Sequence, residues 1–154
     1  YSLDLIYSVS CNRINAGKML KDANMARPII AKSAAAAPDR AQVLSRAVAE
    51  VARHLDIGSS DLGAILGISQ SSASRLMNGL YALHEQQKEW ELAALLVRLY
   101  RGLYSIVGNN EQLAKDWLKS RNRAFGDQIP FAVIKQAAGL VHACDYIDAH
   151  RAAA

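Results

Sequence analysis

The stretch that decides the fold is "SSDLGAILGISQSSASRLMNG", residues Ser59–Gly79. It is typical of two short helices joined by a tight turn at Gly67-Ile68-Ser69. Glycine tolerates a positive φ where the first helix ends, and serine is a good N-cap for the second helix. We expect Ile68 to fill the corner between the two helices.

The second helix of this pair has an apolar side and a polar side. Ala73 and Leu76 lie at helical spacing and should face inward. The outward side chains are short and polar, apart from one long cation; they are Gln70, Ser71, Ser72, Ser74 and Arg75. Short side chains let a helix lie deep in the DNA major groove, where Gln pairs with adenine and Arg with guanine or phosphate. The segment resembles the helix-turn-helix of Xre/Cro-type regulators.

A helix-turn-helix can also be kept only as a scaffold. Residues 44–80 carry three Lys/Arg and three Asp/Glu, so their formal net charge is zero. DNA-binding domains are usually basic. The sequence therefore predicts DNA binding but leaves the scaffold interpretation open.

The flanking sequence is helical. An apolar face at three- and four-residue steps precedes the turn; its members are Leu44, Val48, Val51 and Leu55. Gly58 is expected to end that helix, and Ser59 or Ser60 to cap the next. A long helical pattern from about residue 85 to 107 places further apolar residues on one face; they are Leu92, Leu95, Leu96, Leu99, Leu103 and Ile106. This face exceeds what one small domain covers, which predicts a homodimer.

The C-terminal third also reads as helical. A helix is expected over residues 111–119, and Pro130 suits the first turn of another. Gly139 is expected to interrupt the chain before a final helix, whose inward residues are Leu140, Val141, Cys144 and Ile147. With no convincing strand, the class is all-α. We predict three parts: an N-terminal tail and linker (1–43), a helix-turn-helix domain with a long connecting helix (44–108), and a C-terminal helical domain (109–154).

Charge and cysteine content limit the cellular context. Residues 1–43 carry six Lys/Arg against three Asp/Glu, and Met19 and Met25 offer alternative translation starts. The two cysteines, Cys11 and Cys144, are too far apart to suggest a disulfide framework, which favours a reducing cytoplasm. No apolar run approaches the ~18 residues of a membrane span, and no signal peptide is evident.

The order of motifs behind the helix-turn-helix is informative. It comprises a Trp-containing helix, an Asn in a basic loop, a Gly, a Pro-started helix, a second Gly and an amphipathic helix. The residues that carry it are Trp117, Leu118, Asn122, Phe125, Gly126, Pro130, Gly139 and Val141. With the preceding segment, this pattern resembles the MbcA/ParS/Xre antitoxin family over about residues 44–151.

This resemblance implies an antitoxin with two activities. The C-terminal domain would cover the active site of a cognate RES-domain toxin, a family associated with NAD⁺ breakdown. The helix-turn-helix would bind operator DNA and repress the antitoxin's own operon, in a homodimer and in higher assemblies with the toxin. The residues expected to contact the toxin are Asn122, His142, Asp145, Tyr146, Asp148, His150 and Arg151. Asp145 and Asp148 would oppose cations of an NAD⁺-binding cleft, and Tyr146 would be an anchor.

No catalytic pattern is apparent. The four histidines lack metal-ligand spacing, and no serine lies in a nucleophile elbow. We therefore expect no enzyme activity, no metal and no cofactor. The alternative function is a stand-alone dimeric transcriptional repressor whose C-terminal helices only dimerise.

Overall fold

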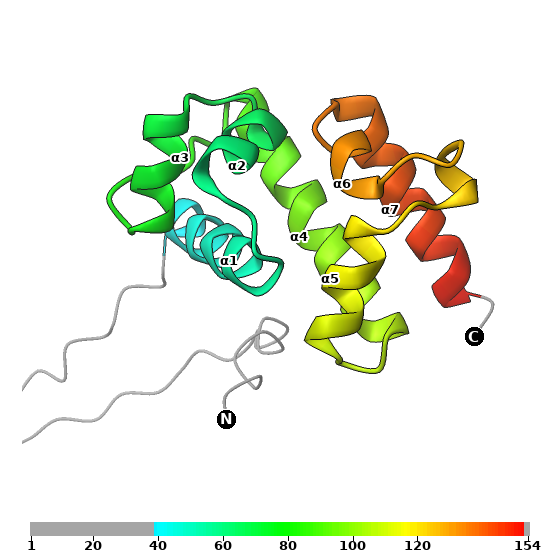
Figure 1. Cartoon of the computed structure of the whole chain (residues 1–154). Helices are drawn as coiled ribbons and strands as arrows, with labels where there is room; N and C mark the ends of the chain where they lie inside the picture. The colour runs from blue at the N-terminus through cyan, green and yellow to red at the C-terminus, as the bar shows by residue number, and fades with distance from the viewer. Residues whose placement is uncertain (1–38, 153–154) are drawn as a thin grey trace, which may run out of the picture. The chain divides into compact units, whose positions relative to one another are not determined.

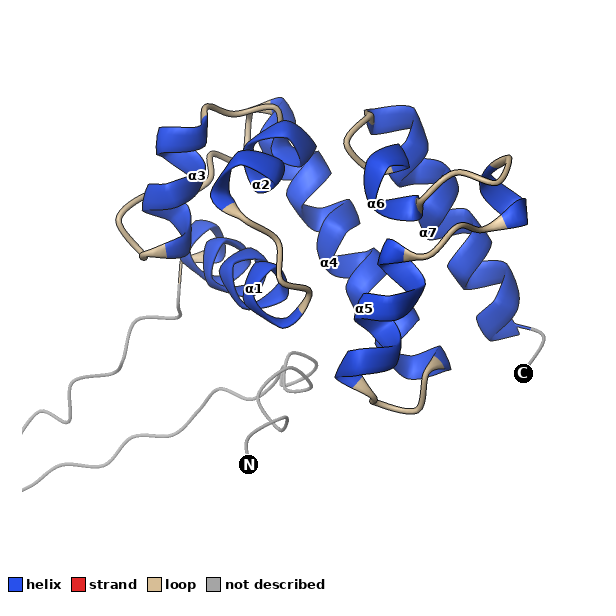
Figure 2. Cartoon of the chain, viewed as in Figure 1, coloured by secondary structure: helices blue, strands red, loops and turns tan. Residues whose placement is uncertain are grey.

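The structure, a computed structural model, describes residues 39–152 (Figures 1 and 2). Over this range the chain is all-α, as predicted, with seven α-helices, one short 3-10 helix and no strand. They are α1 (Arg40–His54), α2 (Ser59–Leu66), α3 (Gln70–Met77), α4 (Lys88–Ile106), α5 (Glu111–Lys119), η1 (Arg123–Phe125), α6 (Pro130–Val133) and α7 (Ala137–Ala152). None of the described helices has the length and apolar character to cross a membrane. The predicted tail lies almost wholly outside the described residues.

The first helix starts earlier than the apolar pattern indicated. Asp39 caps it by accepting a hydrogen bond from the amide of Ala41 at 3.3 Å, so residues 40–43 are helical. Its expected apolar face is confirmed, because Val48, Val51 and Leu55 are buried and Leu44 is half-buried. These side chains pack α1 against α3 and α4.

Two predicted helix boundaries are wrong. α1 ends at His54 rather than at Gly58, because Asp56 takes a left-handed conformation with φ +55° and turns the chain. Gly58 is instead the N-cap of α2, without a side-chain hydrogen bond, and the predicted capping serines, Ser59 and Ser60, are its first two helical residues.

Helix α4 is shared by two groups of helices (Figure 1). It packs against α1 and α2 on one side and against α7 and α5 on another. Of its predicted apolar face, Leu96, Leu99 and Leu103 are buried, but Ile106 is 42% exposed. Both helix groups cover this face, so it does not require a second copy of the chain. The homodimer stays a prediction.

Two glycines allow close backbone contacts in the second group. A Cβ atom on Gly102 of α4 would lie 2.5 Å from Cγ2 of Ile147 on α7, so the two helices cross with no room for a side chain. A Cβ on Gly139 would lie 2.1 Å from the carbonyl oxygen of Val133. The predicted interruption at Gly139 is therefore wrong. Gly139 lies in the first turn of α7 and lets this helix pack against α6.

The inward face of α7 differs from the prediction at one residue. Leu140, Cys144 and Ile147 are buried, whereas Val141 is 42% exposed. Consecutive helical residues are about 100° apart, so the residue after the buried Leu140 points away from α4.

Three ionic contacts join the two helix groups at the surface. Lys119 of α5 donates to Asp56 at 3.0 Å, Lys135 lies 2.7 Å from Asp61 of α2, and His54 Nδ1 lies 3.1 Å from Glu111. Such exposed pairs contribute little stability each.

The Gly102 crossing gives a stability prediction. Gly102→Ala should lower the free energy of unfolding by about 1–3 kcal/mol, because the new methyl group overpacks buried Ile147. Gly58→Ala is the comparison without overpacking, since nothing lies within 4 Å of a Cβ there, and its expected cost is only that of a weaker N-cap on α2, roughly 0.5 kcal/mol. Urea denaturation measures both, and an equal effect of the two substitutions would contradict the tight crossing.

The Asp56–Lys119 pair gives a pH prediction. The hydrogen bond from Lys119 and its charge lower the pKa of the Asp56 carboxyl. The pair therefore stabilises the fold above the unfolded-chain pKa of Asp56, and this contribution is lost as the pH falls through the lower folded pKa. NMR titration should find that Lys119→Gln raises the pKa of Asp56 towards the ordinary aspartate value. Lys88→Gln is the control and should leave it unchanged.

Candidate functional site

The turn between α2 and α3 has the predicted geometry. Gly67 has φ +68°, and the hydroxyl of Ser69 accepts a hydrogen bond from the amide of Ser72 at 3.1 Å. A Cβ on Gly63 would lie 2.9 Å from the carbonyl oxygen of Ile68, so this glycine lets the turn fold back closely on α2. Ile68 is half-buried against the core, as expected for a residue that fills the corner. The turn therefore fixes the angle at which α3 projects.

Helix α3 presents its polar side to solvent. Ala73 and Leu76 are buried, which confirms the inward face. Among the predicted DNA-binding residues, Gln70, Ser71 and Arg75 are exposed, whereas Ser72 and Ser74 are half-buried. The structure thus brings all five together on one helix, with the longer side chains outermost.

Some of the serines on α3 have local partners. The hydroxyls of Ser71 and Ser72 each lie 2.9 Å from that of Ser69, and Arg75 Nη2 lies 3.5 Å from the Ser72 hydroxyl. At the C-terminal end of α3, the side-chain amide of Asn78 donates to the carbonyl oxygen of Ser74 at 2.8 Å. The hydroxyls of Ser71 and Ser72 therefore take part in the N-cap of α3. The side chains of Gln70 and Arg75 are exposed to solvent. A helix with such a face fits the DNA major groove.

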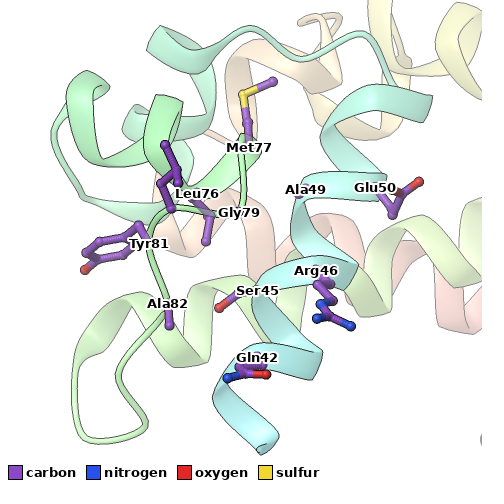
Figure 3. Close-up of a pocket in the computed structure, with 11 residues that line it drawn as sticks. Gln42, Ser45, Arg46, Ala49, Glu50, Leu76, Met77, Gly79, Tyr81 and Ala82 are labelled. Atoms are coloured by element: carbon purple, nitrogen blue, oxygen red, sulfur yellow. The ribbon is translucent and has the colours of Figure 1, made fainter. Parts of the chain in front are cut away.

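One groove lies beside α3 rather than on its polar face. It has a volume of about 730 Å³ and lies between α1 and the loop after α3, with Gln42, Arg46 and Glu50 on the α1 side (Figure 3). The hydroxyl of Ser45 fixes its floor by accepting a hydrogen bond from the buried amide of Leu83 at 2.9 Å. None of the predicted site residues lines this groove.

In the C-terminal group, Asn122 shapes the loop after α5. Its side-chain oxygen accepts a hydrogen bond from the amide of Ala124 at 2.9 Å, and its backbone amide donates to Gln128 at 3.0 Å. Gly126 then turns the chain with φ +64°. This loop places Phe125 in the core, against α5 and α7.

The rings around Phe125 form an aromatic cluster, which we define as Trp117, Phe125, His142, Tyr146 and His150. The Tyr146 ring lies 5.3 Å from Phe125, 6.3 Å from Trp117 and 4.2 Å from His150, between ring centroids. His142 lies 5.0 Å from Phe125. Both histidines are exposed at the rim, while Tyr146 and Trp117 are half-buried. The cluster packs Tyr146 of α7 against Trp117 of α5 and Phe125 of the loop that follows α5.

The predicted acidic residues lie on the other side of α7, where they meet α4. Arg98 Nε donates to Asp148 at 2.9 Å, and Arg98 also lies 3.6 Å from Asp145. Arg151 lies 3.5 Å from Asp148. Asp148 is therefore already paired within the chain, whereas the Asp145 side chain remains 64% exposed. Arg98 cannot be recognised from the sequence as part of this surface, because it lies 50 residues from its partner Asp148.

Of the seven predicted toxin-binding residues, six lie on α7 and Asn122 lies in the loop after α5. On α7 the aromatic residues contact rings of α5 and its following loop, whereas the acidic residues lie towards Arg98 of α4.

The described residues hold few reactive groups. No set of three His, Cys, Asp or Glu side chains within residues 39–152 is arranged to hold a metal ion. Burial raises the pKa of the Cys144 thiol to about 11, and the thiol donates to the carbonyl oxygen of Leu95 at 3.3 Å. At neutral pH it is therefore a protonated, packed side chain rather than a nucleophile.

Comparison with known families matches both halves of the structure. The antitoxin Xre-like helix-turn-helix domain matches residues 34–98, and the antitoxin Xre/MbcA/ParS C-terminal toxin-binding domain matches residues 102–152. No curated protein matches the chain. The first match covers α1 to α3 and much of α4, and the second covers α5 to α7. The chain belongs to the Xre/MbcA/ParS family of antitoxins.

Proposed function

We propose that this antitoxin neutralises a cognate RES-domain toxin by covering its active site and represses its own operon through α3. The observation that carries the proposal is that a helix-turn-helix domain and a toxin-binding domain occur in one chain and share α4. The RES toxin and its NAD⁺ chemistry follow from the family resemblance alone. On this proposal the antitoxin acts by covering surfaces and catalyses no reaction itself, in the cytoplasm where the operon is transcribed.

On the DNA side, the residues of α3 would make different kinds of contact. Gln70 and Arg75 are exposed and have the longest side chains, so they would contact base edges or phosphates, while Ser74 would make closer contacts and Ser71 would share its hydroxyl with the cap. Ser72 would act mainly through the cap, because its hydroxyl already bonds Ser69. Two copies of α3 in a homodimer would read the two halves of a palindromic operator.

On the toxin side, the solvent face of α7 is the best-placed contact surface. His142, Asp145 and Ala149 are all exposed on this helix. Asp145 is the acid best able to oppose a cation of the toxin cleft, because Asp148 is occupied by Arg98 and Arg151. Tyr146 and His150 would border the contact at the aromatic cluster. A surface held rigid by packing loses little entropy when it binds.

The operator interface gives a prediction. Arg75→Ala should weaken operator binding by about tenfold or more, because one base or phosphate contact contributes ~1–3 kcal/mol. Arg53→Ala is the control, since that arginine lies on α1 and pairs with Glu50. Fluorescence anisotropy with the operator DNA measures both. The Arg75→Ala protein should still protect cells from the toxin; loss of both activities in a protein whose circular dichroism spectrum is unchanged would contradict the separation of the surfaces.

The toxin interface gives a second prediction. Ala149→Arg should weaken the complex by ~1–3 kcal/mol and abolish protection, because a long side chain would separate α7 from the toxin. Ala64→Arg on α2 is the matched control, since Ala64 is also an exposed helical alanine. Truncation of α7 is unsuitable, because Leu140 and Ile147 belong to the core.

Co-expression with the toxin, with cell survival and NAD⁺ content as readouts, tests the Ala149→Arg prediction. The toxin face would lie elsewhere if Ala149→Arg protected cells as well as Ala64→Arg. If the unaltered antitoxin gave no protection and left NAD⁺ falling, the proposed neutralisation of an NAD⁺-degrading toxin would be wrong.

A further inference from the structure

A second groove lies between α4 and α7, away from α3. It has a volume of about 490 Å³, and we call it the arginine groove; its lining residues are Ala94, Val97, Arg98, Arg101, Ser105 and Arg151. Arg98, Arg101 and Ser105 follow one another at helical spacing along α4, and Arg151 approaches from α7. Three arginines and one serine therefore line one groove.

The groove contains more positive than negative charge. No acidic residue lines it. Asp148 lies at its edge and is shared, with Arg98 Nε at 2.9 Å and Arg151 Nη1 at 3.5 Å. Arg101 is exposed and makes no ion pair with any residue in the described part of the chain. Three arginines meet only two carboxylates here, Asp148 and Asp145, which lies 3.6 Å from Arg98, so one positive charge is left uncompensated and the arrangement favours an anionic ligand.

Two of the three arginines are also held in place. Asp148 fixes Arg98 through two guanidinium nitrogens, and Arg151 passes over Gly102, where a Cβ would lie 3.7 Å from its Cδ. A guanidinium that is fixed on one edge keeps its other N–H groups free to donate. The donors of Arg98 and Arg151 are therefore oriented before a ligand arrives, while Arg101 is exposed and can turn towards it.

We propose that the arginine groove binds a phosphate group. A carboxylate offers two oxygens, which a single bidentate arginine can satisfy. A phosphate ester offers up to three non-bridging oxygens and up to two negative charges, and matches donors that come from Arg98, Arg101, Arg151 and the Ser105 hydroxyl. This assigns Arg151 to the groove rather than to the predicted toxin contact. The proposal does not depend on the identity of the toxin.

Binding in this groove would join the two helices. Arg98 and Arg101 belong to α4 and Arg151 belongs to α7, so one bound phosphate would bridge the crossing at Gly102. A ligand that binds only the folded state raises the apparent stability of that state. Phosphate binding should therefore raise the melting temperature of the protein as well as give a binding isotherm.

The test uses the full chain and sodium pyrophosphate at constant ionic strength. Isothermal titration calorimetry should give saturable binding, and Arg101→Gln should weaken it by about tenfold, the loss expected for one charge-assisted hydrogen bond. Arg101 is exposed, so the substitution should leave the circular dichroism spectrum unchanged. Arg123→Gln is the matched control, because Arg123 is also exposed but lies outside the groove.

A second arm identifies the source of the phosphate. The same proteins are titrated with a duplex DNA of unrelated sequence. Pyrophosphate binding that depends on Arg101, with equal DNA affinity in all proteins, would support a small phosphorylated ligand. An Arg101-dependent loss of DNA affinity would support a backbone phosphate of DNA.

Two results would overturn the proposal. One is an absence of saturable pyrophosphate binding together with DNA affinity that does not depend on Arg101. The other is an equal loss in Arg101→Gln and Arg123→Gln, which would indicate non-specific attraction to surface charge.

Discussion

The close crossing of α4 and α7 at Gly102 is the contact on which the rest of the structure depends. Because Gly102 has no side chain, Ile147 can lie directly against the α4 backbone. This brings Leu95 and Cys144 together and sets Arg98 beside Asp148. Since α4 also packs against α1 and α2, the crossing joins the DNA-binding and toxin-binding domains through one rigid element rather than through a flexible linker.

This arrangement gives α7 two different sides. One side is held by aromatic rings, with Tyr146 packed between Trp117, Phe125 and His150. The other is held by Arg98, which occupies Asp148 and approaches Asp145. Side chains that looked unpaired in the sequence therefore have partners within the chain, and the toxin contact stays a prediction.

The helix-turn-helix was predictable in detail, and its surroundings less so. Gly67, Ser69 and Ala73 have their expected roles because a turn and a cap are local structures set by neighbouring residues. The predicted roles of Gly139 and Val141 are wrong. Gly139 is needed because the Val133 backbone lies close to it, and Val141 is exposed because α4 packs against another face of α7. Apolar periodicity locates a helix face but does not say how wide the contact is.

The all-α class, the polar face of α3 and the family can be recognised from the sequence, since each depends on residue types at short, fixed spacing. Which charged residues are free depends on how the helices pack. Arg98 and Asp148 are 50 residues apart, and Asp56 and Lys119 are 63 apart. Such partners meet only when the helices pack, because packing, not spacing along the chain, sets distances between elements.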